Sequence, residues 1–223
     1  MKTLQDDQEV IRRISGDLQL KAVERKPDQV KSITLLLHGL NERGLRIYRK
    51  LLKSLPSDTH IVAPNAPFPL PRLKSDRLDY GYAWYFYNQF TQNYDVDQTM
   101  AISLLKNLLV EINPHHLPVT IIGFSQGGYL APLLAYEIKE TKLVIGISCE
   151  FRINFFSDTP QFSLVAIHGD QDPVIHFEQA QNEIKLLKEK NIEVAWHLIS
   201  QLKHEINQEA AQLIKTILEQ HGN

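Results

Sequence analysis

The sequence predicts a doubly wound α/β fold, in which a mostly parallel central sheet carries helices on both faces. Segments of strand length alternate with segments of helical periodicity over most of the 223 residues, as in parallel strands joined by helical crossovers. Two strand segments, 33–37 and 143–147, are nearly continuous apolar runs, which is typical of strands buried on both faces of a parallel sheet. The length and the 43% of hydrophobic residues suit a single domain spanning 1–223.

The individual elements follow from the same two periodicities. The expected strands are 18–23, 33–37, 60–63, 119–122, 143–147, 164–167 and 193–198, and the expected helices are 47–55, 99–112, 128–139, 177–190 and 205–220. The segment 64–91 breaks the alternation, because it is long and rich in proline and aromatic residues. Loops of that length in compact domains are usually functional or disordered, and the aromatic content argues against disorder. We therefore expect an aromatic-rich loop near the active site.

Composition narrows the class of protein. The formal net charge of −2 gives no indication of a nucleic-acid partner or of binding to an anionic membrane surface. The first residues lack the apolar core of a signal peptide, and no apolar run approaches the roughly 20 residues that span a bilayer. The single cysteine, Cys149, cannot form an internal disulfide, which fits a reducing compartment. We expect a soluble, cytoplasmic protein without integral membrane association.

The most informative motif follows the strand segment 119–122. Gly-Phe-Ser-Gln-Gly-Gly at 123–128 leads from this strand into a helical pattern. G-x-S-x-G in that context is the nucleophile elbow of α/β-hydrolases. A serine on so sharp a turn is crowded two positions away on each side, where only glycine fits comfortably. The motif predicts Ser125 as a nucleophile at the positive end of the following helix.

A serine hydroxyl becomes a good nucleophile only when a histidine removes its proton and an acid orients that histidine. In this fold the chain order is Ser, then Asp or Glu, then His. Asp172 lies in a loop directly after the strand segment 164–167, at the strand ends where active sites form. Asp170 is the alternative acid, although it can instead shape the turn by accepting backbone N–H groups. His204 follows the strand 193–198, opens the last expected helix, and is the expected base.

Acyl transfer also requires donors for the oxyanion of the tetrahedral intermediate. One is expected from the main-chain N–H of Gln126, which follows the nucleophile. The other is expected from the main-chain N–H of Leu40, because His38-Gly39-Leu40 leaves an early buried strand.

Several of these segments resemble one known family. L-L-L-H-G-L at 35–40, G-F-S-Q-G-G at 123–128, G-D-Q-D-P-V at 169–174 and His204 are similar to the carboxylesterase/phospholipase group that includes acyl-protein thioesterases. Ala-Pro-Asn-Ala-Pro at 63–67 and Ala-Trp-Tyr at 83–85 also resemble segments of that family. The resemblance covers roughly residues 33 to 220. It implies an α/β-hydrolase fold, the triad Ser125, Asp172 and His204, an oxyanion hole from Leu40 and Gln126, and hydrolysis of carboxylic esters or thioesters through an acyl-serine intermediate without a cofactor.

Three positions depart from the family pattern. Asn41-Glu42 stands where the family usually has Gly-Asp, Lys203 precedes the histidine in place of glycine, and Phe86 replaces an acidic residue after Trp84-Tyr85. These departures concern the substrate pocket more than the catalytic residues.

The expected substrate is a small-molecule ester or thioester with a small or medium acyl group. Phe68, Trp84 and Tyr85 are candidate substrate contacts, since active sites are largely apolar clefts, but the same aromatic segment can equally be core packing. The alternatives are a lysophospholipase and a non-catalytic relative that only binds a ligand, although such relatives typically lose a triad member. We expect no metal site, because His115-His116 lacks carboxylate or cysteine partners in the sequence and fits a solvated turn.

Overall fold

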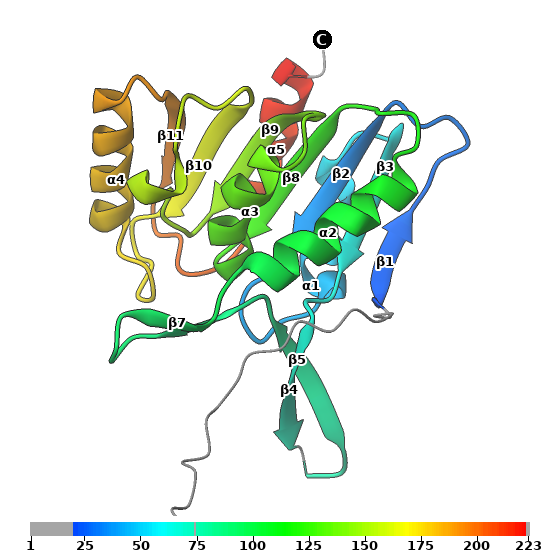
Figure 1. The fold of residues 1–223 in the computed structure, drawn as a ribbon, viewed down its shortest axis with the longest axis horizontal. Coiled ribbons are helices and arrows are strands. Elements are labelled where there is room, and N and C mark those ends of the chain that lie inside the picture. Colours follow the sequence, from blue (N-terminus) through cyan, green and yellow to red (C-terminus); the bar gives the residue numbers. More distant parts are fainter. Residues whose placement is uncertain (1–19, 74, 222–223) are drawn as a thin grey trace, which may run out of the picture.

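The computed structural model describes residues 20–73 and 75–221, which form a central sheet covered by helices on both faces (Figure 1). Its seven strands lie in the order β1-β3-β2-β8-β9-β10-β11. Their bounds are Ala22–Arg25 for β1, Ser32–Leu37 for β2, Thr59–Pro64 for β3, Val119–Phe124 for β8, Thr141–Ile147 for β9, Ser163–Gly169 for β10 and Val194–Ile199 for β11. All neighbours pair in parallel except β1, which runs antiparallel to β3.

Two hydrophobic cores lie on opposite faces of this sheet. The helices are α1 (Gly44–Leu51), α2 (Thr99–Ile112), α3 (Gln126–Tyr136), α4 (Phe177–Glu189) and α5 (Gln208–His221), with short 3-10 helices η1 (Leu52–Ser54) and η2 (Ile153–Phe155). Leu105, Leu130 and Leu187 bring α2, α3 and α4 onto one face. Ile47 and Ile214 bring α1 and α5 onto the other. The predicted mostly parallel sheet with helices on both faces is therefore confirmed.

Burial along the strands explains the sequence pattern. The central strands β2, β8 and β9 are buried at nearly every position, so both of their faces need apolar side chains. The edge strand β1 alternates between exposed and half-buried positions, and its apolar content is correspondingly low. The first strand was expected at 18–23, of which 18–19 lie outside the described residues, and in the described part it begins at Ala22.

The last helix begins later than the sequence pattern indicates. It was expected from residue 205, yet α5 begins at Gln208. The side-chain oxygen of Asn207 accepts the N–H of Ala210 at 2.9 Å, which is the geometry of an N-cap. His204 therefore lies in the loop between β11 and α5 and does not open the helix.

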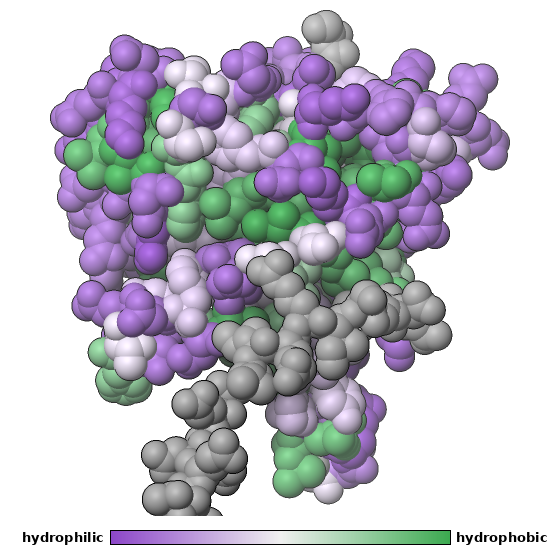
Figure 2. All heavy atoms as spheres, viewed as in Figure 1, coloured by the Kyte–Doolittle hydropathy of each residue, from purple (hydrophilic) through white to green (hydrophobic). Residues whose placement is uncertain are grey.

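The segment 64–91, expected as a loop, contains most of two antiparallel hairpins. Strand β4 (Phe68–Leu73) pairs with β5 (Leu78–Ala83), and β6 (Phe86–Asn88) pairs with β7 (Asn93–Val96). Prolines are tolerated in β4 because a strand of a two-stranded ribbon has a free edge. Both hairpins project beyond the carboxyl ends of the parallel strands (Figure 1). Hydrophobic side chains gather at the far end of the β4–β5 hairpin (Figure 2), where Leu73 and Leu78 are exposed.

Candidate active site

Ser125 occupies a strained turn between β8 and α3. Its backbone has φ 50° and ψ −119°, a region that residues other than glycine rarely adopt. The turn is tight because a Cβ on Gly123 would lie 2.2 Å from the carbonyl oxygen of Gly127, and a Cβ on Gly127 would lie 2.2 Å from that of Leu37. The two glycines are therefore required by close approach of backbone to backbone, as the sequence predicts. The carbonyl of Ser125 accepts the N–H of Tyr129 at 3.1 Å, which anchors the first turn of α3.

The structure brings Ser125, His204 and Asp172 into one hydrogen-bonded chain. The Ser125 hydroxyl donates to Nε2 of His204 over 3.0 Å, and Nδ1–H of His204 donates to Oδ2 of Asp172 over 2.8 Å. The three residues follow β8, β11 and β10 respectively. The carboxyl ends of parallel strands lie at one edge of a sheet, so residues far apart in the chain meet there.

Asp172 is held as a carboxylate by its surroundings. Its other oxygen accepts the N–H groups of Val174 at 2.9 Å and Ile175 at 3.0 Å. Burial raises the pKa of Asp172, but the hydrogen bonds from His204 and from these two N–H groups outweigh it, so the pKa lies below its ordinary value. An ionised Asp172 fixes the tautomer of His204 in which Nε2 is free to accept a proton.

Asp170, the alternative acid, has a different partner. Its carboxylate accepts the N–H of Gln201 at 2.6 Å. The N–H of Gln171 in turn donates to the carbonyl of Leu202 at 3.1 Å. Asp170 therefore joins the loop that carries Asp172 to the loop that carries His204, and it shapes this turn without contacting the histidine.

Leu40 lies in the loop after β2, and Gln126 is the first residue of α3, directly after β8 and the elbow. Strands β2 and β8 are neighbours, with Leu37 paired to Gly123, so the loops that follow them meet. The residues on either side of Leu40 use their N–H groups within the protein, Gly39 toward Glu42 at 3.3 Å and Asn41 toward Tyr82 at 2.8 Å. In the part of the chain that the structure describes, the N–H groups of Leu40 and Gln126 have no protein partner.

The buried ring of His38 connects the loop that carries Leu40 to the segment after β3. Its ring is fully buried, with Nδ1–H donating to the carbonyl of Gly39 at 2.7 Å and Nε2 accepting the N–H of Ala66 at 3.0 Å. Its own carbonyl accepts Nε1–H of Trp84 at 2.8 Å. Burial lowers the pKa of His38 from 6.5 to about 4, against a smaller opposite effect of the Gly39 bond. His38 is therefore a neutral structural bridge at neutral pH, a role that the sequence pattern did not reveal.

The side chain of Gln126 binds the aromatic segment to the elbow. Its oxygen accepts the N–H of Trp84 and its nitrogen donates to the carbonyl of Tyr85, both at 2.9 Å. Trp84 has no exposed surface, which favours the core-packing interpretation for this residue. Tyr85 is 7% exposed, and Phe68 is half-buried with its ring 5.5 Å from that of Phe86. Trp84 and Tyr85 therefore both belong to the hydrophobic core on this face of the sheet, and Phe68 is the candidate substrate contact that is only half-buried.

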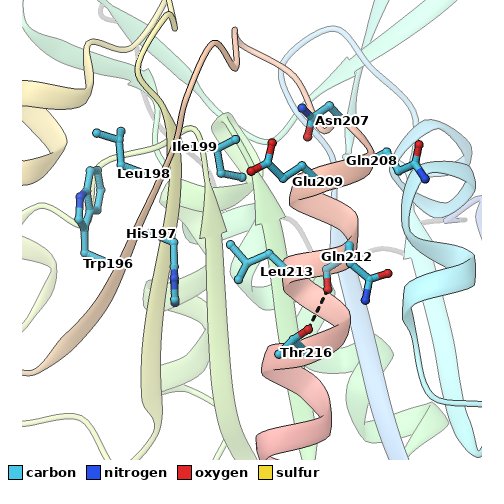
Figure 3. Close-up of a pocket in the computed structure, with 10 residues that line it drawn as sticks. All are labelled: Trp196, His197, Leu198, Ile199, Asn207, Gln208, Glu209, Gln212, Leu213 and Thr216. Carbon is cyan, nitrogen blue, oxygen red and sulfur yellow. Dashed lines mark hydrogen bonds between the residues drawn. The ribbon is translucent and has the colours of Figure 1, made fainter.

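Hollows on the surface differ in their relation to the triad. One of about 1060 Å³ lies between β11 and α5, with His197, Ile199 and Leu213 among its lining residues (Figure 3). No triad residue lines it, so its size does not make it the active site. A much smaller cavity of about 20 Å³ adjoins His204 and Phe124.

Two further properties concern the described residues as a whole. Within them no group of three or more His, Cys, Asp or Glu side chains is arranged to hold a metal ion, and His116 is hydrogen-bonded to Glu140 at 2.7 Å. None of the helices between residues 20 and 221 has the length and apolar character needed to cross a membrane.

The sequence model of one protein family, Phospholipase/Carboxylesterase, matches residues 18–222. The chain belongs to this family. Solved structures with the same fold include the esterase PE8, with a TM-score of 0.71 and 22% identity over 92% of this chain and 100% of that one. Acyl-protein thioesterase 2 of Zea mays has a TM-score of 0.69 and 20% identity over 92% and 99% of the two chains. The Bacillus cereus carboxylesterase has a TM-score of 0.68 and 18% identity over 91% and 94%. Membership of this family supports a hydrolase of the esterase and thioesterase type.

Proposed function

We propose that this member of the phospholipase/carboxylesterase family is a serine hydrolase that cleaves carboxylic esters or thioesters through an acyl-serine intermediate. The observation that carries the proposal is the hydrogen-bonded chain from Ser125 through His204 to Asp172. Each side chain has the chemistry that its place in this chain requires, namely a hydroxyl, an imidazole and a carboxylate. The names of the structural neighbours, esterase and acyl-protein thioesterase, favour the same reaction class.

In the proposed mechanism, His204 accepts the Ser125 proton as Oγ attacks the substrate carbonyl carbon. The carbonyl oxygen becomes negative and accepts hydrogen bonds from the N–H groups of Leu40 and Gln126, which stabilises the tetrahedral intermediate by several kcal/mol. His204 then donates its proton to the leaving group. It next takes a proton from the water that attacks the acyl-serine and returns it to Oγ. Asp172 remains ionised and stabilises the imidazolium in both halves of the reaction.

The proposal is tested by steady-state kinetics on 4-nitrophenyl esters and matched thioesters of increasing acyl length, with lysophospholipids as a separate series. Ser125→Ala and Asp172→Asn should each lower kcat by about four to six orders of magnitude, while circular dichroism shows an unchanged fold. Ser157→Ala, in an exposed loop, is the matched control and should retain full activity. Near-normal turnover by Ser125→Ala would overturn the mechanism, and a rate confined to lysophospholipids would move the substrate class to the phospholipase side of the family.

A further inference from the structure

We propose that Arg152 is a specificity-determining residue, which binds an anionic group on the substrate. The inference rests on the proposed function, and it adds a substrate class: esters or thioesters that carry a carboxylate or phosphate in addition to the reacting carbonyl. It follows from the position of Arg152, from the groups that orient it and from the donors that it leaves unused.

Arg152 lies in the loop after β9, next to the nucleophile elbow. The N–H of Ser125 donates to the carbonyl of Ile147 at the end of β9, at 2.8 Å. Two residues further, the Cys149 side chain packs on the first turn of α3, since a Cβ on Gly128 would lie only 2.5 Å from its sulfur. The loop that carries Arg152 therefore lies against the elbow at the same edge of the sheet as the triad.

The guanidinium group is held between two tyrosine rings. Its central carbon lies 5.2 Å from the ring centroid of Tyr129 and 5.9 Å from that of Tyr87. Tyr129 lies on the first turn of α3, where its N–H donates to the carbonyl of Ser125 at 3.1 Å. Tyr87 belongs to β6, directly after the segment that Gln126 binds to the elbow. Arg152 thus stands between the elbow helix and the aromatic hairpin β6–β7.

Glu150 orients the guanidinium group through its Nε edge only. The Nε–H of Arg152 donates to the Glu150 carboxylate at 3.0 Å, and Glu150 is 9% exposed. Among residues 20–73 and 75–221, the terminal Nη groups of Arg152 have no hydrogen-bond partner in the protein. The side chain is 35% exposed, so these donors are accessible. The terminal edge of a fixed guanidinium matches the geometry of a carboxylate or phosphate.

A purely structural role would be to fasten the β6–β7 hairpin to the body of the protein. That role requires the stacking of the guanidinium group on the two tyrosines, and it does not use the Nη hydrogen-bond donors. Anion binding uses them. The two roles also differ in their kinetics: loss of a structural contact disturbs all substrates alike, whereas loss of an anion contact affects charged substrates alone and acts mainly on KM.

The test compares charged and neutral esters in wild type, Arg152→Gln and Arg152→Lys. The 4-nitrophenyl half-ester of glutaric acid, against the neutral pentanoate ester, places the anion on the acyl side. The acetate ester of 4-hydroxybenzoic acid, against phenyl acetate, places it on the leaving-group side. Arg152→Gln should raise KM for the anionic ester of one of the two pairs by about tenfold to a hundredfold. The kcat for that ester, and both KM and kcat for the neutral esters, should change by less than about twofold. Arg152→Lys should lie between, because lysine keeps the charge and loses the fork.

Arg49→Gln, on the exposed side of α1, is the matched control and should leave both pairs of substrates unchanged. Equal losses on charged and neutral esters would overturn the inference in favour of a structural role, and an unchanged KM for both anionic esters would overturn it outright. Calorimetric binding of the half-ester to Ser125→Ala, with and without Arg152→Gln, needs no turnover. An absence of esterase activity in the wild-type protein would contradict the proposed function. The ratio of the two calorimetric affinities, with and without Arg152→Gln, would still decide the role of Arg152.

Discussion

The buried neutral His38 makes the stability of the fold depend on pH between about 4 and 6.5. Protonation of Nε2 would break the bond from the Ala66 N–H and place a charge in a fully buried position. The folded protein therefore takes up this proton only near the lowered pKa of about 4, whereas the unfolded chain takes it up near 6.5. Between these values the unfolded state binds more protons, so the free energy of unfolding rises with pH.

The size of this effect follows from the two pKa values. One pKa unit corresponds to about 1.4 kcal/mol, and the pKa of His38 falls from 6.5 to about 4. Lowering the pH through this window should therefore remove about 3 kcal/mol of stability, with a slope that approaches about 1.4 kcal/mol per pH unit. This is a large share of the roughly 5–15 kcal/mol that stabilises an ordinary domain.

Urea unfolding at a series of pH values, in wild type and His38→Gln, measures this contribution. The variant should be less stable at pH 7, and its stability should fall less steeply between pH 6.5 and 4. Burial also lowers the pKa of His168, but that contribution is common to both proteins and cancels in the difference. His115→Gln, at an exposed position, should follow the wild-type curve. Parallel curves for wild type and His38→Gln would refute the assignment of this pH dependence to His38.

Two further predictions concern buried groups near the elbow. Gln126→Ala leaves the N–H of Trp84 and the carbonyl of Tyr85 without their partners, so it should lower the free energy of unfolding in urea by about 2–4 kcal/mol. A loss below about 0.5 kcal/mol would show that these two hydrogen bonds do not stabilise the fold. Cys149 is buried and burial raises the pKa of its thiol, so Ellman's reagent should react with it only after unfolding in urea; rapid reaction of the native protein would contradict this packing.

The parts of the fold that the sequence predicts well are those with a local signal. Continuous apolar runs mark the central strands, because both faces of β2, β8 and β9 are buried. The glycines around Ser125 mark the elbow, because a Cβ on Gly123 or Gly127 would lie 2.2 Å from a backbone carbonyl oxygen. The expected acid and base meet the serine because each follows a parallel strand of the same sheet.

The parts that the sequence pattern missed depend on tertiary contacts or on competing local signals. The prolines in β4 suggest a loop, and only pairing with β5 makes that segment a strand. The apolar periodicity predicts a helix from residue 205, although Asn207 is a residue type that favours the N-cap. The N-cap bond of Asn207 places the start of α5 beyond His204. The hydrogen bond between the Gln126 side chain and Trp84 and the contact of Arg152 with Tyr87 join segments far apart in the chain. No local sequence pattern predicts such contacts.

Labelling with a fluorophosphonate probe, with the adduct mapped by mass spectrometry, measures whether His204 and Asp172 activate Ser125. Such probes react with serines whose hydroxyl is activated for acyl transfer. We predict a single adduct at Ser125 in wild type, none in Ser125→Ala, and much slower labelling in Asp172→Asn. An unlabelled but folded wild-type protein, or labelling that persists in Ser125→Ala, would contradict this prediction.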